Sequence, residues 1–258
     1  MTYFAFLIRF LGIPIAILAT VAYLDSRRGR KVPANLSYWP FAAAVGLHIV
    51  VAVLYTTPWD NFLVATGVWT YDPALVTGIT LGWVPIEEYI FFVVQTILAG
   101  LWMLFLVRRL RLGGPHPPLS SRWRLIPAVL LAPLWLVSMA ILVARWAPGT
   151  YLGLELAWAL PPIIIQIGFG GDILRRYGRL VLLSILGMIA YLSAADFLAI
   201  GSGTWAISPG QSLAVLIGGV LPLEEVVFFL LTNTLITFGM VLLISQDGHA
   251  RVRELWRR

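Results

Sequence analysis

Long apolar runs alternate with short polar segments along the whole chain. A membrane-spanning helix needs about 20 mostly apolar residues. Seven runs come close to this length or exceed it, at about residues 3–24, 39–57, 80–106, 125–144, 150–169, 180–200 and 214–244. The pattern therefore predicts an all-α, polytopic membrane protein with seven transmembrane helices.

The composition narrows the class of protein further. Of the 258 residues 60% are hydrophobic and 12% are charged, against roughly half and a quarter in soluble domains, and the mean hydropathy is +0.89. This excludes a soluble enzyme and a disordered chain. The chain has no cysteine, which excludes thiolate metal sites and cysteine nucleophiles.

The basic residues give the predicted orientation. Sixteen of the eighteen fall into four clusters, within residues 27–31, 108–124, 175–179 and 251–258. The positive-inside rule places all four in the cytoplasm if the N-terminus is outside and the C-terminus inside. The net charge of +6 then needs no nucleic acid partner. We expect a multi-pass protein of the cell membrane, with the lipid bilayer as its partner.

Seven helices also suggest a retinal protein, but a retinal Schiff base needs a lysine inside the bundle. The single lysine, Lys31, lies in a basic loop, so covalent retinal is excluded.

A motif occurs twice in the chain, about 136 residues apart. It reads Gly-x-x-Pro-x-Glu-Glu-x-x-Phe-Phe at residues 82–92 and again at 219–229. Upstream, Asp60 precedes Trp69 by nine residues, and Asp196 precedes Trp205 by the same number. The duplication predicts two parallel three-helix repeats, at residues 1–107 and 150–258, the second with a basic tail. A basic loop and a linker helix, residues 108–149, would join them.

Acidic residues within apolar runs are the candidate chemistry. A carboxylate in hydrocarbon costs roughly 2.5–3.5 kcal/mol. Arg9 and Arg145, the basic residues outside the clusters, cannot neutralise the eight acids that lie outside the basic loops. Several of these acids should therefore be protonated, and a neutral carboxylic acid can act as a general acid. The predicted catalytic residues are the repeated acids: Asp60, Glu87, Glu88, Asp196, Glu224 and Glu225. For Glu155 a purely structural role stays open.

Aromatic residues accompany the acids. Each glutamate of a pair has a phenylalanine four residues later, on the same helix face, and a phenyl face stabilises a nearby positive centre. A proton donor beside such a face suits protonation of an alkene and steering of the carbocation. The predicted substrate-binding residues are Trp69, Pro85, Phe91, Phe92, Trp205, Pro222, Phe228 and Phe229. The two prolines are expected to kink their helices just before the acids.

These residues resemble the membrane-embedded lycopene cyclase family, which occurs as two small subunits or as one fused chain. The likeness covers essentially the whole chain, and the motifs that carry it lie at residues 55–61, 67–69 and 85–88 in the first half and 222–229 in the second. It implies conversion of the linear ψ ends of lycopene into β rings, giving γ-carotene and then β-carotene, without cofactor, redox change or metal. Because the halves also occur as separate partners, the resemblance favours one composite site. Asp72 and Asn61 lack counterparts in the second half and are weaker candidates.

Other interpretations stay open at this stage. A proton-coupled transporter or channel would also use repeated intramembrane acids. A prenyltransferase would need aspartate-rich motifs that bind Mg²⁺, and the adjacent glutamates do not match such motifs. A scaffold protein without catalytic activity would leave the energetic cost of the intramembrane acids unexplained. The sequence does not say which glutamate donates the proton, and it is compatible with a homo-oligomer.

Overall fold

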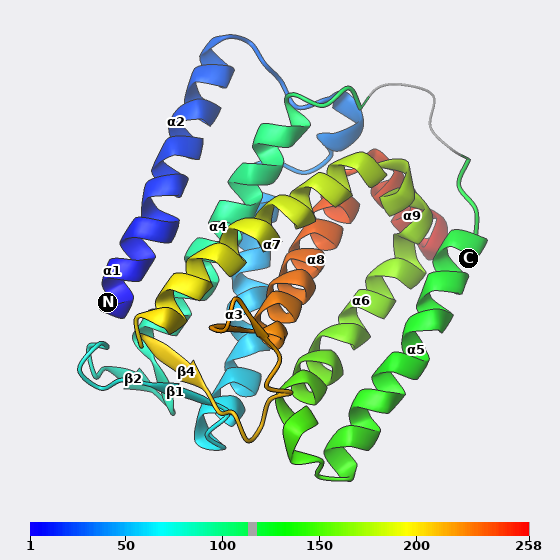
Figure 1. The fold of residues 1–258 in the computed structure, drawn as a ribbon. Helices are drawn as coiled ribbons and strands as arrows, with labels where there is room; N and C mark the ends of the chain where they lie inside the picture. The colour runs from blue at the N-terminus through cyan, green and yellow to red at the C-terminus, as the bar shows by residue number, and fades with distance from the viewer. Residues whose placement is uncertain (113–117, 258) are drawn as a thin grey trace.

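The computed structural model describes residues 1–112 and 118–257; residues 113–117, inside the predicted linker segment, lie outside the described residues. The chain is mostly helical, with a few very short strands (Figure 1). The elements in order are α1 (Tyr3–Phe6), η1 (Leu7–Gly12), α2 (Ile13–Arg27), η2 (Ala34–Leu36), α3 (Phe41–Ala65), β1 (Trp69–Tyr71), β2 (Thr80–Leu81), β3 (Val84–Pro85), α4 (Ile86–Val107), α5 (Arg122–Val143), η3 (Ala147–Gly149), α6 (Thr150–Arg176), α7 (Gly178–Gly201), β4 (Trp205–Ile207), β5 (Leu216–Ile217), β6 (Leu221–Pro222), α8 (Leu223–Ile244) and α9 (Gln246–Trp256).

The seven predicted spans are confirmed. Over the described ranges, seven helical segments are long and apolar enough to cross a membrane: Tyr3–Arg27, Ala34–Ala65, Ile86–Val107, Arg122–Val143, Ala147–Arg176, Gly178–Gly201 and Leu223–Ile244. The predicted arrangement as two parallel repeats stays a prediction.

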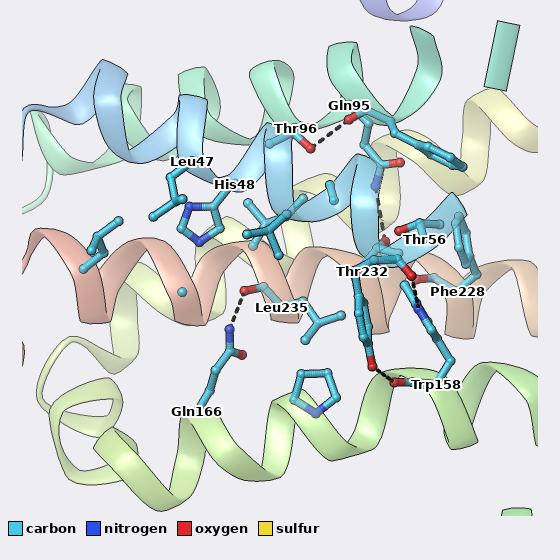
Figure 2. Close-up of a pocket in the computed structure, with 18 residues that line it drawn as sticks. Leu47, His48, Thr56, Gln95, Thr96, Trp158, Gln166, Phe228, Thr232 and Leu235 are labelled. Atoms are coloured by element: carbon cyan, nitrogen blue, oxygen red, sulfur yellow. Dashed lines mark hydrogen bonds between the residues drawn. The ribbon is translucent and has the colours of Figure 1, made fainter. Parts of the chain in front are cut away.

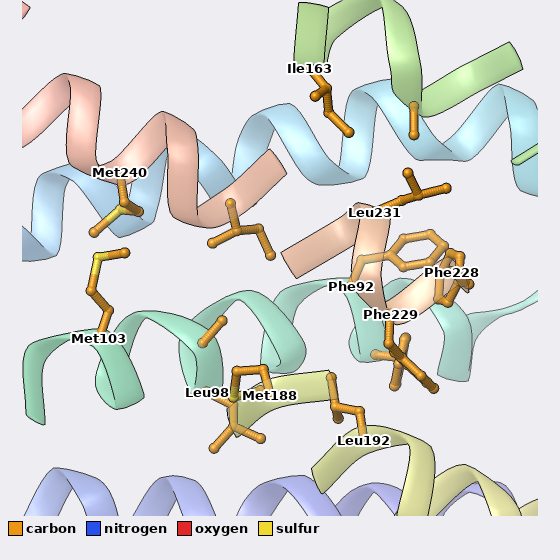
Figure 3. Packing of buried hydrophobic residues seen from close by; sticks show 14 of the residues in the cluster. Phe92, Leu98, Met103, Ile163, Met188, Leu192, Phe228, Phe229, Leu231 and Met240 are labelled. Carbon is orange, nitrogen blue, oxygen red and sulfur yellow. The ribbon is translucent and has the colours of Figure 1, made fainter. Parts of the chain in front are cut away.

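Helices α4 and α8 form the centre of the bundle. About half of each span is buried, 56% for α4 and 50% for α8, whereas α5 is 6% buried and packs on α6 at the periphery. Met103 of α4 and Met240 of α8 face each other in the core, and the phenyl rings of Phe92, Phe228 and Phe229 gather further along the same two helices (Figure 3). The central pair carries both Glu-Glu motifs.

The starts of these two helices differ from the prediction. Residues expected in the third and seventh spans instead form hairpins, β2 with β3 and β5 with β6, so α4 begins at Ile86 and α8 at Leu223. Pro85 and Pro222 do not kink helices. They are the extended N-cap residues, since proline has no N–H to donate and its ring is tolerated at a helix start. Each Glu-Glu pair therefore lies in the first turn of its helix.

The second predicted span was too short. It was expected to end at residue 57, with a loop from Pro58, but α3 continues to Ala65 with Pro58 inside it. Asp60 is therefore a helical, fully buried residue and not part of a loop.

A pair of strands joins the two halves of the chain. β1 and β4 run antiparallel, with Thr70 opposite Ala206, the residue 136 positions later. Each strand follows the helix that carries the repeated aspartate, α3 or α7. The pairing brings Trp69 and Trp205 to the same end of the bundle, opposite the end where α9 lies (Figure 1).

Arginines and acids pair at that other end. Arg109 contacts Asp25 at 2.8 Å, Arg176 contacts Asp247 at 2.7 Å and Arg251 contacts Asp172 at 2.6 Å. In the part of the chain that the structure describes, none of the eight acids outside the basic loops forms an ion pair. Among the described residues, neither Arg9 nor Arg145 forms an ion pair with any of these acids.

Candidate active site

A small cavity of about 30 Å³ lies between the two halves of the chain. Its lining combines residues of both: Tyr3, Trp69, Tyr71, Glu88, Phe91, Asp196, Trp205, Glu225, Phe228 and Phe229. Three of the six predicted catalytic acids and five of the eight predicted substrate-binding residues meet here. Eight of the fourteen predicted site residues thus line one cavity that both halves of the chain form; that they are the working site stays a prediction.

Glu88 is held by phenolic hydroxyls. Tyr71 Oη donates a hydrogen bond of 2.7 Å to Glu88 Oε1, and Tyr3 lies beside the same carboxyl. Burial, together with the neighbouring Glu88, raises the pKa of Tyr71 well above its ordinary value. Tyr71 therefore stays a neutral donor, and the arrangement suits a carboxylate at Glu88.

Glu225 and Asp196 form a carboxyl pair. Tyr151 Oη donates to Glu225 Oε1 at 2.8 Å, and Trp205 Nε1 donates to Asp196 Oδ1 at 2.9 Å. The two carboxyl groups also contact each other, while Asp196 Oδ2 meets no donor among the described residues. Two buried carboxylates have only acceptor atoms to offer each other, so a proton between them would supply the missing donor.

The first glutamate of each pair has different neighbours. Glu87 Oε1 accepts a hydrogen bond of 2.7 Å from the backbone N–H of Thr77, and Glu224 Oε1 accepts one of 2.6 Å from Leu213. Neither residue lines the small cavity. Consecutive helix residues point about 100° apart, so the second glutamate faces the cavity and the first faces the loop that precedes the hairpin.

Two further acids are buried without hydrogen bonds. Both carboxyl oxygens of Asp60 and of Glu155 meet no partner among the described residues. Asp60 lies near Glu88, and Glu155 lies near Tyr151 and Glu224. They surround the site without lining the small cavity.

A larger, apolar cavity of about 380 Å³ adjoins the acid-lined one. It lies among α3, α4, α6 and α8. Phe92 lines this large cavity, whereas Phe91 lines the small cavity with Glu88; the sequence had instead predicted that Phe92 accompanies Glu88. Phe228 lines both cavities. Figure 2 shows Phe228 and Trp158 near one end of the large cavity and His48 and Gln166 near the other.

A row of aromatic rings follows the cavity to the acids. Trp59 stacks on Trp158 with ring centroids 4.7 Å apart and lies parallel to Phe228 at 5.9 Å. Trp69 meets the edge of Phe228 at 5.7 Å. On the outside, Tyr55 Oη donates to the backbone oxygen of Trp158 at 2.8 Å, which joins α3 to α6. Because Tyr55 is exposed on the bundle surface, the row runs from the outer surface of the bundle to the acid cluster.

Over the described ranges, no three His, Asp or Glu residues are placed to hold a metal ion. What the site offers is buried carboxyl groups, phenolic hydroxyls and aromatic faces.

Sequence reasoning missed three tyrosines, Tyr3, Tyr71 and Tyr151. One signal could have found two of them. Tyr3 and Tyr151 are 148 positions apart, as are Pro14 and Pro162, so the first helices of the two halves align at this offset. Tyr71 has Ile207 at the corresponding position, and no duplication points to it.

Comparison with known proteins identifies the family. No family model and no solved structure matches the chain. The lycopene beta-cyclase of Halobacterium salinarum is 35% identical over 258 residues, covering 99% of both chains. The bifunctional lycopene cyclase/phytoene synthases of Podospora anserina and Phaeosphaeria nodorum are 40% and 36% identical over 76% and 89% of this chain, which spans only 34% and 39% of their length. The chain belongs to the lycopene cyclase family.

Proposed function

We propose that the protein is a lycopene beta-cyclase of the membrane. Its substrate would be lycopene, whose ψ ends are converted to β rings through γ-carotene to β-carotene. The observation that carries the proposal is one composite cluster of buried acids, Glu88, Asp196 and Glu225, beside an apolar, aromatic-lined cavity. The full-length likeness to the Halobacterium enzyme supports it.

In this proposal the Asp196–Glu225 pair holds the proton that starts the reaction. The proton adds to C2 of a ψ end and leaves a cation at C1. The π electrons of the C5=C6 bond then form the C1–C6 bond, and the charge moves to C5. General acid catalysis of this kind contributes about 10²–10⁴-fold.

Glu88 is the proposed base. It removes the proton from C6, which restores the C5=C6 bond inside the new ring. The product is an isomer of the substrate, so the reaction is that of an isomerase and consumes no redox equivalent. Because Glu88 and the pair line the same cavity, the proton can return to the pair for the next turnover.

The phenyl rings have a proposed role in the cationic step. Phe91, Phe228 and Phe229 line the cavity together with the acids, and an aromatic face attracts a positive centre within about 6 Å. Glu87 and Glu224 would hold the loops that precede the hairpins instead of touching the substrate. Pro85 and Pro222 would set the start of each acid-bearing helix.

For topology we propose the N-terminus outside and the C-terminus in the cytoplasm, which places the basic clusters inside. The acid cluster then lies towards the outer face of the membrane.

Expression in a host that accumulates lycopene tests the function. Pigments separated by chromatography should shift from lycopene to γ-carotene and β-carotene. Lycopene that stays unchanged, with the protein present in the membrane fraction, would overturn the proposal and favour a transport function.

A further inference from the structure

The strands β1 and β4 belong to the two copies of the duplicated sequence and pair with each other (Figure 1). Trp69 and Trp205 occupy equivalent positions in them, 136 residues apart, and Tyr71 has Ile207 as its counterpart. In the ladder Tyr71 lies opposite Trp205, and Ile207 lies opposite Trp69. Because alternate residues of a strand and their cross-strand partners share one face, these four side chains lie on the same face of the ladder. The two halves differ there in a tyrosine against an isoleucine.

That face borders the acid-lined cavity, and Tyr71 supplies a hydrogen-bond donor that Ile207 lacks. Both tryptophans and Tyr71 belong to the cavity lining. Tyr71 Oη donates to Glu88 Oε1 at 2.7 Å, whereas an isoleucine side chain has no polar atom. The strand of the first half therefore donates a hydrogen bond to its glutamate, and the strand of the second half has no equivalent donor for Glu225.

The carboxyl groups around the two glutamates differ accordingly. Asp196 contacts Glu225, and a proton shared by this pair supplies the donor that two carboxylates lack. Asp60, the counterpart of Asp196, lies near Glu88 but meets no hydrogen-bond partner among the described residues. Glu88 receives phenolic donors instead, and a carboxylate accepts these without a proton of its own. The unequal strand position therefore suits a base in the first half and an acid pair in the second.

The position of the base decides which ring the proposed reaction yields. Ring closure leaves the positive charge at C5, next to hydrogens on C6, on C4 and on the methyl group of C5. Loss of the C6 proton gives the C5=C6 bond of a β ring, loss from C4 gives the C4=C5 bond of an ε ring, and loss from the methyl group gives the exocyclic bond of a γ ring. In each case the electrons of one C–H bond form the double bond and the proton goes to the base. A carboxylate that is not held in place would reach all three.

We propose that the Tyr71 hydroxyl fixes the Glu88 carboxylate where it takes the proton from C6, which makes Tyr71 a positioning residue that sets the ring type. This rests on the proposed cyclase function. The Tyr71 ring is itself held, since it stacks on the Tyr3 ring with centroids 6.2 Å apart and an angle of 16° between the planes. Burial raises the pKa of Tyr71 well above its ordinary value, so the hydroxyl keeps its proton and remains a donor.

The test compares substitutions of two buried tyrosines. Tyr71→Phe removes the hydroxyl and keeps the ring, and Tyr71→Ile installs the residue of the second half. The matched control is Tyr89→Phe: Tyr89 follows Glu88 on α4, its hydroxyl donates to the backbone oxygen of Leu81 at 2.8 Å, and it lines neither the acid-lined nor the large cavity. Purified protein in lipid vesicles converts lycopene, and chromatography separates the pigments. The double bond of a β ring is conjugated with the polyene and those of ε and γ rings are not, so absorption spectra identify the rings.

We expect the wild-type protein and Tyr89→Phe to form β rings. Tyr71→Phe should lower lycopene conversion at least about 10-fold, because a hydrogen bond to a charged group is lost. In the pigment that still forms, the ratio of ε and γ rings to β rings should rise at least about 10-fold. Tyr71→Ile should shift this ratio in the same direction. A loss of stability alone would lower all pigments together and leave the ratio unchanged.

Pigments with β rings only, in either folded Tyr71 variant, would overturn the proposal whatever their rate of formation. An equal shift of the ring ratio in Tyr89→Phe would also overturn it, because the effect would then not depend on the hydroxyl that contacts Glu88. Failure of the wild-type protein on lycopene would instead overturn the proposed function itself, so the two failures are distinguishable.

Discussion

The two glutamates of each Glu-Glu pair are neighbours in sequence but have different surroundings. Glu87 and Glu224 are buried against backbone N–H groups of the preceding loops. Glu88 and Glu225 receive tyrosine hydroxyls and line a cavity shared by both halves of the chain. All four side chains are buried, so burial alone does not separate the two kinds.

The difference shows that the two glutamates of one repeated pair can have different contacts and therefore different roles. The first glutamate accepts a backbone N–H from the loop before the hairpin, and the second faces the small acid-lined cavity. The geometry of a helix enforces this division, because adjacent residues cannot face the same direction.

Replacing the cavity acids should have the largest effect. Glu225→Gln and Glu88→Gln keep an oxygen that can accept the tyrosine hydrogen bond, but neither side chain can exchange an acidic proton. We expect lycopene conversion to fall at least about 100-fold in each, measured by chromatography of the pigments. The matched controls Glu224→Gln and Glu87→Gln still accept the loop N–H and should stay within about fivefold of wild type. Full activity in Glu225→Gln would contradict the proposed proton donor.

Removing the loop contacts should affect stability more than chemistry. Glu87→Ala and Glu224→Ala remove the acceptor of the part-buried hydrogen bond from the N–H of Thr77 or Leu213, a contribution of about 0.5–1.5 kcal/mol. Thermal unfolding in detergent should show a lower Tm, while the folded fraction keeps cyclising. As a control, Asp72→Ala removes an exposed acceptor of a loop N–H and should change the Tm little. A Tm unchanged in both glutamate variants would show that the loops do not depend on these contacts.

The smallest effect concerns the difference between the two tryptophans. Trp205 Nε1 holds Asp196 of the carboxyl pair, whereas Trp69 Nε1 meets no partner of hydrogen-bonding geometry in the described structure. Trp205→Phe should lower the rate of conversion up to about 10-fold, since one hydrogen bond contributes about 0.5–1.5 kcal/mol. Trp69→Phe keeps the aromatic face and should stay nearer to wild type. A larger loss of activity in Trp69→Phe than in Trp205→Phe would contradict the proposed role of the hydrogen bond from Trp205 to Asp196.

Much of this site could be predicted from residues alone. The duplicated spacing selected Glu88, Asp196 and Glu225 together with Trp205 and Phe228. It could not separate them from Glu87 and Glu224, since the duplication repeats all four glutamates. It also missed Tyr71, which has no repeated counterpart and reaches Glu88 from a strand seventeen residues away.

The sequence by itself determined the seven apolar spans, because the cost of polar groups in lipid imposes the length and hydropathy of each span. It also determined the family, through a motif too long to recur by chance. Only the tertiary structure decided where α4 and α8 begin, which acids meet across the two halves, and that the acid-lined cavity and the large apolar cavity share Phe228. These features depend on contacts between residues far apart in the chain, and local patterns of hydrophobicity carry no information about such contacts.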